Sequence, residues 1–194
     1  MLVVQHSGYV LAGGKSSRMG RDKALLPFRG TTLVQHVAQV VARAVGNVTL
    51  VGPAERYAHL GLRVIEDQWP GFGPLAGIHR ALLDCPADWA VIVACDLPYL
   101  SPDLLSWMLK FTATEVETDV FLATLDGVRP EPLCGVYRKT IVTTAGAALL
   151  AGRRKVVDML SGLRIQMVPV SDARLLTNIN TPSEWREVVL RSDD

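Results

Sequence analysis

The sequence contains few residues of the kinds that form cross-links or bind zinc. Its 194 residues include only three cysteines, Cys85, Cys95 and Cys134, and no two of them have Cys-x-x-Cys spacing. An odd, widely spaced set argues against disulfides and zinc ligands, and favours reduced, mostly buried thiols. The four histidines share no metal-ligand spacing either. A disulfide scaffold and a zinc-binding module are therefore not expected.

The sequence also lacks an excess of one charge and a long apolar segment. Lysine and arginine together number 20, against 19 aspartate and glutamate residues, and the one basic cluster is Arg153-Arg154-Lys155. A dedicated nucleic-acid-binding protein carries more basic surface, so nucleic acid is not an expected partner. No apolar stretch approaches the length of a membrane span, and the N-terminus has no signal-peptide pattern. We expect a soluble, cytoplasmic protein that does not associate with a membrane.

The composition is that of a globular domain. Hydrophobic residues make up 49% of the chain and charged residues 20%, and a chain of this length buries roughly 70% of the surface that its unfolded form exposes. No repeat, low-complexity stretch or linker marks a second domain. Residues 1–194 are therefore expected to form a single domain.

Segments of helical periodicity alternate with apolar segments that are typical of strands. The predicted strands are residues 9–12, 48–51, 63–65, 89–94, 120–123, 131–137 and 163–168. The run 89–94 is nearly continuous, as expected for a central parallel strand covered on both faces. Residues 131–137 include Pro132 and Gly135, which favours an edge strand or an irregular strand near a ligand. The alternation predicts a three-layer α/β/α sandwich with a mostly parallel, partly mixed sheet of the Rossmann-like type.

The most informative stretch follows the first predicted strand, where a glycine turn is succeeded by several cations. Gly13 and Gly14 let the backbone turn and approach a ligand without interference from a Cβ atom. Lys15, Arg18 and Lys23 follow, among small polar residues. Exposed amide groups with cations close by are typical of a site that cradles polyphosphate.

The spacing in this loop excludes two common nucleotide motifs. A Walker A loop requires a glycine five positions before the glycine of Gly14-Lys15-Ser16, and Tyr9 occupies that position. A dinucleotide fingerprint requires Gly-x-Gly-x-x-Gly, and Lys15 lies two positions after Gly13. The loop is therefore a phosphate cradle of another type, or an ordinary glycine-rich turn with solvated charges.

Carboxylates follow two further predicted strands. Asp67 comes after residues 63–65, and Asp96 comes after residues 89–94. Ligands of open α/β sheets bind beyond the carboxyl ends of the strands, and carboxylate oxygens together with substrate phosphates suit Mg²⁺. We predict that the two carboxylates lie at adjacent strand ends and face the glycine loop, with Asp96 as the metal ligand. The alternative for Asp96 is a cap or turn before Pro98, and for Asp67 a solvated turn.

Other candidate groups carry weaker arguments. Cys95 adjoins the predicted metal carboxylate, which disfavours a thiolate and hence a cysteine nucleophile. Trp107 and Met108 are expected to pack on a helix and not to stack on bases. The basic residues 153–155 either form a solvated surface or attract the phosphate of an anionic substrate.

The glycine loop forms part of a longer pattern. The stretch from Leu11 to Lys23 reads L-A-G-G-x-S-x-R-M-G-x-x-K and resembles the signature of the nucleotidyltransferases, in the branch that completes the molybdenum cofactor. The segments GPLAG at 73–77, CDLP at 95–98 and NINTP at 178–182 resemble the later motifs of the molybdenum cofactor guanylyltransferases, in the same order. The resemblance covers nearly the whole chain. One departure is Val51, where some relatives carry a polar residue near the nucleotide.

The resemblance implies a role for individual residues. Residues 1–100 would form a nucleotide-binding half and residues 101–194 an acceptor-binding half. Asp96 would hold Mg²⁺, Arg18, Lys23 and Asp96 would be catalytic, and Asn178 and Asn180 would bind the acceptor. GTP would contact Leu11, Ala12, Gly13, Gly14, Lys23, Asp67 and Asp96, and its nucleoside would lie against Gly73, Pro74, Leu75 and Gly77.

The implied reaction transfers GMP from GTP to the terminal phosphate of molybdenum-molybdopterin and releases pyrophosphate. The acceptor phosphate is already an anion, so the protein needs only to align the reactants and neutralise charge. Transient contacts with cofactor-insertion proteins are also implied. Two alternatives remain open: a cytidylyl or sugar-phosphate nucleotidyltransferase of the same fold, and a non-catalytic partner that binds GTP as a regulatory ligand.

Overall fold

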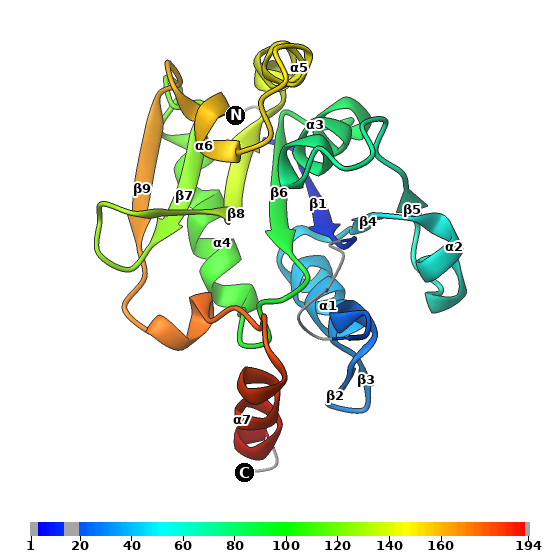
Figure 1. Cartoon of the computed structure of the whole chain (residues 1–194). Coiled ribbons are helices and arrows are strands. Elements are labelled where there is room, and N and C mark those ends of the chain that lie inside the picture. Colours follow the sequence, from blue (N-terminus) through cyan, green and yellow to red (C-terminus); the bar gives the residue numbers. More distant parts are fainter. Residues whose placement is uncertain (1–3, 14–19, 193–194) are drawn as a thin grey trace.

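The computed structural model describes residues 4–13 and 20–192, which fold around a seven-stranded sheet (Figure 1). The strand order is β5-β4-β1-β6-β8-β7-β9, and a separate ribbon pairs β2 with β3. The strands are β1 (His6–Leu11), β2 (Pro27–Phe28), β3 (Thr31–Thr32), β4 (Thr49–Val51), β5 (Val64–Ile65), β6 (Trp89–Ala94), β7 (Val120–Thr124), β8 (Pro130–Arg138) and β9 (Ile165–Pro169). The helices are α1 (Leu33–Val45), α2 (Ala54–Tyr57), α3 (Pro74–Asp84), α4 (Pro102–Lys110), α5 (Val142–Leu150), α6 (Val156–Leu160) and α7 (Pro182–Ser192). Of the helices in this part of the chain, none is both long and apolar enough to cross a membrane.

The sheet buries its side chains in two hydrophobic cores, one on each face. Every side chain of β6 is buried, and successive side chains alternate between the two cores. Trp89, Val91 and Val93 pack with α1, α4 and α7, whereas Ala90 and Ile92 pack with α3, α5 and α6. Figure 1 shows the resulting helices on both sides of the sheet. The predicted three-layer sandwich is therefore confirmed.

Within the described residues, β8 is the strand of this sheet that runs against its neighbours. β1 pairs in parallel with β4 and β6, β4 with β5, and β7 with β9. β8 is antiparallel to both β6 and β7. The predicted mostly parallel, partly mixed sheet is confirmed. Residues 131–137 are irregular, as one alternative predicted, but the other alternative is wrong because β8 lies inside the sheet and not at its edge.

The irregularity in β8 is a bulge of three residues on the side of β7. Leu122 of β7 pairs with Gly135, but the next residue, Ala123, pairs with Glu131, so residues 132–134 have no partner in β7. The bulge also accommodates proline inside the sheet. The buried hydroxyl of Tyr137 donates to the carbonyl of Pro132 across the bulge. Because β8 is antiparallel to β6, its first residues lie at the sheet edge where β6 ends.

Local sequence signals account for several helix starts. The hydroxyl of Thr32 accepts from the amide of Gln35 at the start of α1, and the Gln35 side chain accepts from the amide of Thr32. Thr181 and Glu184 make the same reciprocal pair at the start of α7. Ser101 caps α4. The sequence did not indicate α2 or the β2–β3 ribbon, because both are too short to show a period.

The ends of β1 and β4 approach each other too closely for a side chain. The amide of Ala12 donates to the carbonyl of Val51 at 2.8 Å. A Cβ atom on Gly52 would lie 2.1 Å from the carbonyl oxygen of Ala12 and 3.0 Å from the ring of Tyr57. Glycine at position 52 therefore lets the residues after β4 close on the residues after β1.

The variant Gly52→Ala should lower the free energy of unfolding by about 1–3 kcal/mol, because the new methyl group forces the backbone of Ala12 to move. Gly146→Ala in α5 is a suitable control. Its Cβ would meet the movable imidazole of His79 at 3.2 Å, and alanine favours a helix over glycine. Urea unfolding of both variants measures the difference, and equal stabilities would contradict the close approach at Gly52.

Candidate active site

Of the glycine turn predicted after the first strand, the structure describes Gly13. Ala12 is buried, whereas Gly13 is exposed and has a φ of +140°, a conformation that residues with a Cβ atom rarely adopt. A Cβ on Gly13 would also lie 3.2 Å from the ring of Pro53. The remaining predicted residues of the loop, Gly14, Lys15 and Arg18, lie outside the described residues, and their roles stay predictions.

The ammonium group of Lys23 joins segments that are far apart in the sequence. Lys23 begins the short 3-10 helix η1 (Lys23–Leu25), and its Nζ lies 2.5 Å from Oδ2 of Asp96. The same Nζ donates to the carbonyl oxygen of Ile179 and to Oδ1 of Asn180, both at 3.1 Å. The side chains of Lys23 and Asp96 are only 17% and 14% exposed. The structure thus brings together three of the predicted site residues.

Asp96 is fixed by the strand that precedes it. The amide of Cys95 donates to the carbonyl of Leu11 at 3.1 Å, which continues the pairing of β6 with β1. The Asp96 carbonyl accepts the amide of Ile179 at 3.1 Å. One carboxylate oxygen, Oδ2, faces Lys23, whereas the buried Oδ1 has no hydrogen-bond partner among the described residues. Because a buried oxygen without a partner is unfavourable, Oδ1 marks a position that a ligand would satisfy.

Asn180 is fixed by the helix that follows it. Oε2 of Glu184, in the first turn of α7, accepts the amides of Asn180 and Thr181 at 2.6 and 2.9 Å. The hydrogen bond from Asn180 is the main cause that lowers the pKa of Glu184. The capping box read from the sequence therefore also places the amide side chain that contacts Lys23.

A second carboxylate, Glu131, lies at the same edge of the sheet, at the start of β8. Nδ2 of Asn178 donates to its Oε2 at 3.5 Å. Burial raises the pKa of Glu131, and the charge of Asp96 raises it further, against the lowering effect of hydrogen bonds from Leu133 and Asn178. No described lysine or arginine forms an ion pair with Glu131. Sequence reasoning missed this residue, although it predicted that its strand is irregular near a ligand.

Asp67 lies apart from this group. It follows β5, and its Oδ1 accepts the amide of Trp69 at 2.9 Å. β5 is the edge strand, and β4 and β1 lie between β5 and β6. The prediction that Asp67 and Asp96 occupy adjacent strand ends is therefore wrong, because the order of strands in the sheet differs from their order in the chain. The contact of Asp67 with a nucleotide stays a prediction.

The predicted nucleoside wall is the start of α3. Gly73 precedes the helix with a φ of +71°, and Pro74 is the first helical residue. Both are exposed, whereas Leu75 and Gly77 are buried. A Cβ on Gly77 would lie 3.2 Å from the side chain of Leu11. Gly77 therefore packs α3 against the end of β1. The contacts of residues 73–77 with a nucleoside stay a prediction.

The basic segment 153–155 lies beside this turn and is exposed. A Cβ on Gly73 would lie 3.5 Å from the carbonyl oxygen of Arg154. The guanidinium carbon of Arg154 lies 5.0 Å from the centre of the Phe72 ring. The segment therefore borders the start of α3, and its attraction for an anion stays a prediction.

The cysteines have the environment of structural thiols. All three are buried and unpaired by disulfides. Burial raises the pKa of Cys95, and the neighbouring Asp96 adds to the increase. Burial also raises the pKa of Cys134 to about 12. Since the thiolate is the nucleophilic form, neither residue is suited to covalent catalysis.

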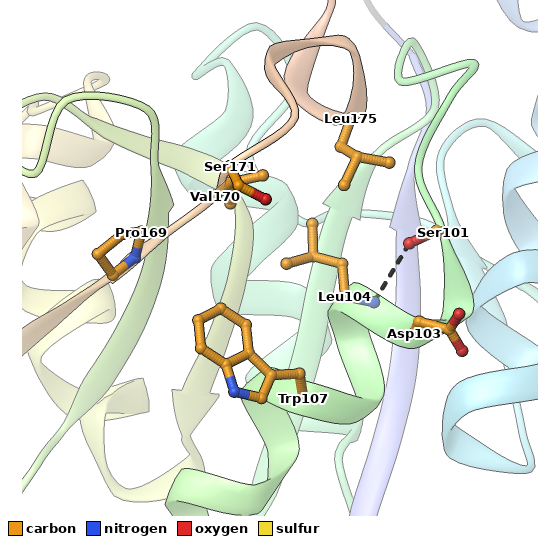
Figure 2. A pocket seen from close by; sticks show the side chains of 8 residues that line it. All are labelled: Ser101, Asp103, Leu104, Trp107, Pro169, Val170, Ser171 and Leu175. Atoms are coloured by element: carbon orange, nitrogen blue, oxygen red, sulfur yellow. Dashed lines mark hydrogen bonds between the residues drawn. The ribbon is translucent and has the colours of Figure 1, made fainter.

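A separate pocket of about 500 Å³ lies where the chain leaves β9 (Figure 2). Trp107 lines it and is 40% exposed, whereas Met108 is buried as expected for a packing residue. None of the residues predicted to bind substrate lines this pocket. The lining residues come from α4 and its capping residue, and from the end of β9 and the segment that follows: Ser101, Asp103, Leu104, Trp107, Pro169, Val170, Ser171 and Leu175.

Known proteins are similar to this chain in sequence and in fold. Residues 8–166 match the MobA-like NTP transferase domain. The chain is 33% identical over 187 residues to a probable molybdenum cofactor guanylyltransferase of Carboxydothermus hydrogenoformans, with 93% of each chain covered. It is 34% identical over 182 residues to the molybdenum cofactor guanylyltransferase of Vibrio cholerae, with 92% of this chain and 88% of that protein covered. The crystal structure of molybdopterin-guanine dinucleotide biosynthesis protein A from Archaeoglobus fulgidus superposes with a TM-score of 0.80 at 26% identity, covering 96% of this chain and 98% of that one.

The variant Glu131→Gln should raise the free energy of unfolding at pH 7, by less than about 1 kcal/mol because the carboxyl is partly hydrated. The pKa of Glu131 is raised in the folded protein, so the wild type gains stability as the pH falls through that pKa. The difference between variant and wild type should therefore shrink as the pH falls and vanish at about pH 3, more than one unit below the unfolded-state pKa of about 4.3, where the glutamate is neutral in both states. Urea unfolding at pH 7 and at low pH measures this. A less stable variant at pH 7 would show instead that the negative charge supports the fold.

Proposed function

This chain belongs to the MobA-like NTP transferase family, and we propose that it transfers GMP from GTP to the terminal phosphate of molybdenum-molybdopterin, with release of pyrophosphate. The observation that carries the proposal is the convergence of Lys23, Asp96 and Asn180 at the carboxyl edge of the parallel strands. That edge is where open α/β sheets bind ligands. The three residues come from three of the segments that resemble the motifs of the molybdenum cofactor guanylyltransferases.

The donor set at this point suits a divalent cation. Oδ2 of Asp96, Oδ1 of Asn180 and the carbonyl oxygen of Ile179 are all oxygen ligands, and together they already hold the cationic ammonium of Lys23. Oδ1 of Asp96 is buried and has no partner among the described residues. We propose that Asp96 and Asn180 hold Mg²⁺, which prefers oxygen ligands and substrate phosphates. Bound there, it supplies charge neutralisation for the transferring phosphate.

In this proposal the protein's own groups orient the two reactants and stabilise the charge on the transferring phosphate. The acceptor phosphate is an anion, so no protein base has to activate it, and the buried thiols are not nucleophiles. Lys23 is a compact point charge on a flexible stem, which suits it to pair with the phosphates of GTP when the Asp96 carboxylate has another partner. Gly13 has a φ of +140° and no Cβ atom, so it would let backbone groups approach a ligand at the end of β1. Alignment and electrostatic stabilisation are therefore the chemistry of the site, with Arg18 as a further predicted cation.

The site lies between the two parts of the sequence. Lys23 and Asp96 come from residues 1–100, whereas Asn178, Ile179 and Asn180 come from residues 101–194. We propose that the first part binds GTP and the second part binds the acceptor, with Asn178 and Glu131 on the acceptor side. Asn180 would then have two roles: its Oδ1 lies at the proposed cation position, and it belongs to the segment that we propose binds the acceptor.

The variant Asp96→Ala should fold but lose turnover by roughly a hundredfold or more, because it removes a charged ligand at the transferring phosphate. Pyrophosphate release at saturating Mg²⁺ and GTP measures turnover. Asp88→Ala provides the control, since Asp88 is an exposed carboxylate that precedes the same strand at its other end. Near-normal turnover of Asp96→Ala would remove Asp96 from the mechanism.

Among the four nucleoside triphosphates, GTP should have a specificity constant at least about a hundredfold above that of CTP, because a site built for one base edge leaves its polar groups unpaired with another. The assay combines the purified protein, molybdenum-molybdopterin and each nucleotide, and detects pyrophosphate. Comparable values for GTP and CTP would assign the protein to cytidylyl transfer. GTP binding without pyrophosphate release from any nucleotide would identify a non-catalytic GTP-binding protein.

A further inference from the structure

A buried tyrosine lies behind the lysine of the site. Tyr57 ends the short helix α2, which follows the close approach at Gly52. The side chain of Tyr57 has no exposed surface. Its ring packs against Gly52, where a Cβ atom would lie 3.0 Å from the ring edge. The position of the ring is therefore set by the same backbone contact that joins the ends of β1 and β4.

The hydroxyl of Tyr57 reaches the residue before Lys23. It donates to Oδ2 of Asp22 at 2.8 Å. Oδ1 of Asp22 accepts the amide of Ala24 at 3.0 Å and so caps η1, the helix that Lys23 begins. The guanidinium of Arg56 lies 3.6 Å from Oδ2 of the same carboxylate. Both oxygens of Asp22 are therefore engaged. Oδ1 caps the helix that Lys23 begins, and Oδ2 links Asp22 to Tyr57 and Arg56 of α2.

The segment 52–57 consequently touches the chain on both sides of residues 14–19. Pro53 lies next to Gly13, as the 3.2 Å approach of a Cβ there shows, and Tyr57 holds Asp22. One compact segment therefore sets the position of the glycine turn after β1 relative to the lysine at the start of η1. Phosphate recognition by backbone amides and a lysine depends on that relative position.

We infer that Tyr57 is a positioning residue for Lys23, acting through Asp22, and that its hydroxyl contributes to recognition of the triphosphate and not of the nucleoside. The inference rests on the proposed function, in which Lys23 meets the phosphates of GTP. Burial, together with the hydrogen bond to Asp22, raises the pKa of Tyr57. The hydroxyl therefore keeps its proton and donates throughout the working range of pH.

The protein contains a matched control for this contact. Tyr9 is 1% exposed, and its hydroxyl donates to Oδ2 of Asp84 at 3.0 Å. Arg63 pairs with the same carboxylate, as Arg56 does with Asp22. Tyr9 belongs to the core on the opposite face of the sheet from Tyr57. Tyr9→Phe thus removes a buried tyrosine–carboxylate hydrogen bond of the same kind without touching Lys23.

The experiment is a double-mutant cycle on ligand binding. Isothermal titration calorimetry with Mg²⁺ present measures the dissociation constants of GTP and of guanosine for the wild type, Tyr57→Phe, Lys23→Ala, the double variant and Tyr9→Phe. Thermal unfolding of each protein checks that it is folded. Asp22→Ala, alone and combined with Lys23→Ala, repeats the cycle by removing the acceptor, in case Tyr57→Phe does not fold.

We expect Tyr57→Phe to weaken GTP binding by up to about tenfold, because the free energy of one hydrogen bond to a charged group is the upper limit of what the positioning of Lys23 can lose. Guanosine binding should be unchanged, and Tyr57→Phe should add no loss in the Lys23→Ala background. Tyr9→Phe should leave both affinities at the wild-type value. Equal weakening of GTP and guanosine by Tyr57→Phe, or additive losses in the double variant, would overturn the inference while leaving the role of Lys23 intact. An unchanged GTP affinity in Lys23→Ala would overturn both the inference and the proposed phosphate contact of Lys23.

Discussion

The ion pair between Lys23 and Asp96 is the interaction on which the site depends. It joins the end of the central strand β6 to the helix that follows the glycine loop, and the same ammonium reaches Ile179 and Asn180 near the C-terminal helix. A mostly buried carboxylate is costly without a cation. In the absence of substrates Lys23 fulfils that requirement, which keeps three motifs assembled. Because the Asp96 carboxylate needs a cation, we propose that a divalent cation replaces Lys23 beside it when GTP binds. Phosphate oxygens of GTP would then complete the ligands of the divalent cation and pair with the displaced ammonium of Lys23.

The sheet topology explains why so many polar groups meet at one edge. The parallel strands β1, β4 and β6 end there, so Gly13, Gly52 and Asp96 follow in neighbouring positions. β8 runs the opposite way, and its first residues therefore start at the edge where β6 ends, which brings Glu131 to the group. The bulge in β8 releases this strand from strict pairing where it meets the site. One reversed strand thus adds a carboxylate to the sheet edge where Lys23, Asp96 and Asn180 meet.

Features that depend on neighbours in the sequence could be predicted, whereas features that depend on strand order could not. The strand at residues 89–94 and the capping boxes at Thr32 and Thr181 are local, and each is found in the structure. The position of Asp96 at a strand end could also be predicted, because an apolar run typical of a buried strand directly precedes it. The separation of Asp67 from Asp96 required knowledge that β4 and β1 lie between β5 and β6. Tyr57 and Asp22 are 35 positions apart in the chain, and no pattern in the sequence predicts that they are in contact.

In the proposed site, Asp96 and Asn180 form a cation position that Lys23 occupies only until Mg²⁺ and GTP bind. Anomalous diffraction from crystals grown with Mn²⁺ and a non-hydrolysable GTP analogue tests it directly. We expect one anomalous peak within about 2.3 Å of a carboxylate oxygen of Asp96 and of Oδ1 of Asn180, with Nζ of Lys23 moved from Asp96 to a phosphate oxygen. A bound nucleotide with Lys23 still paired to Asp96, and manganese elsewhere or absent, would contradict it.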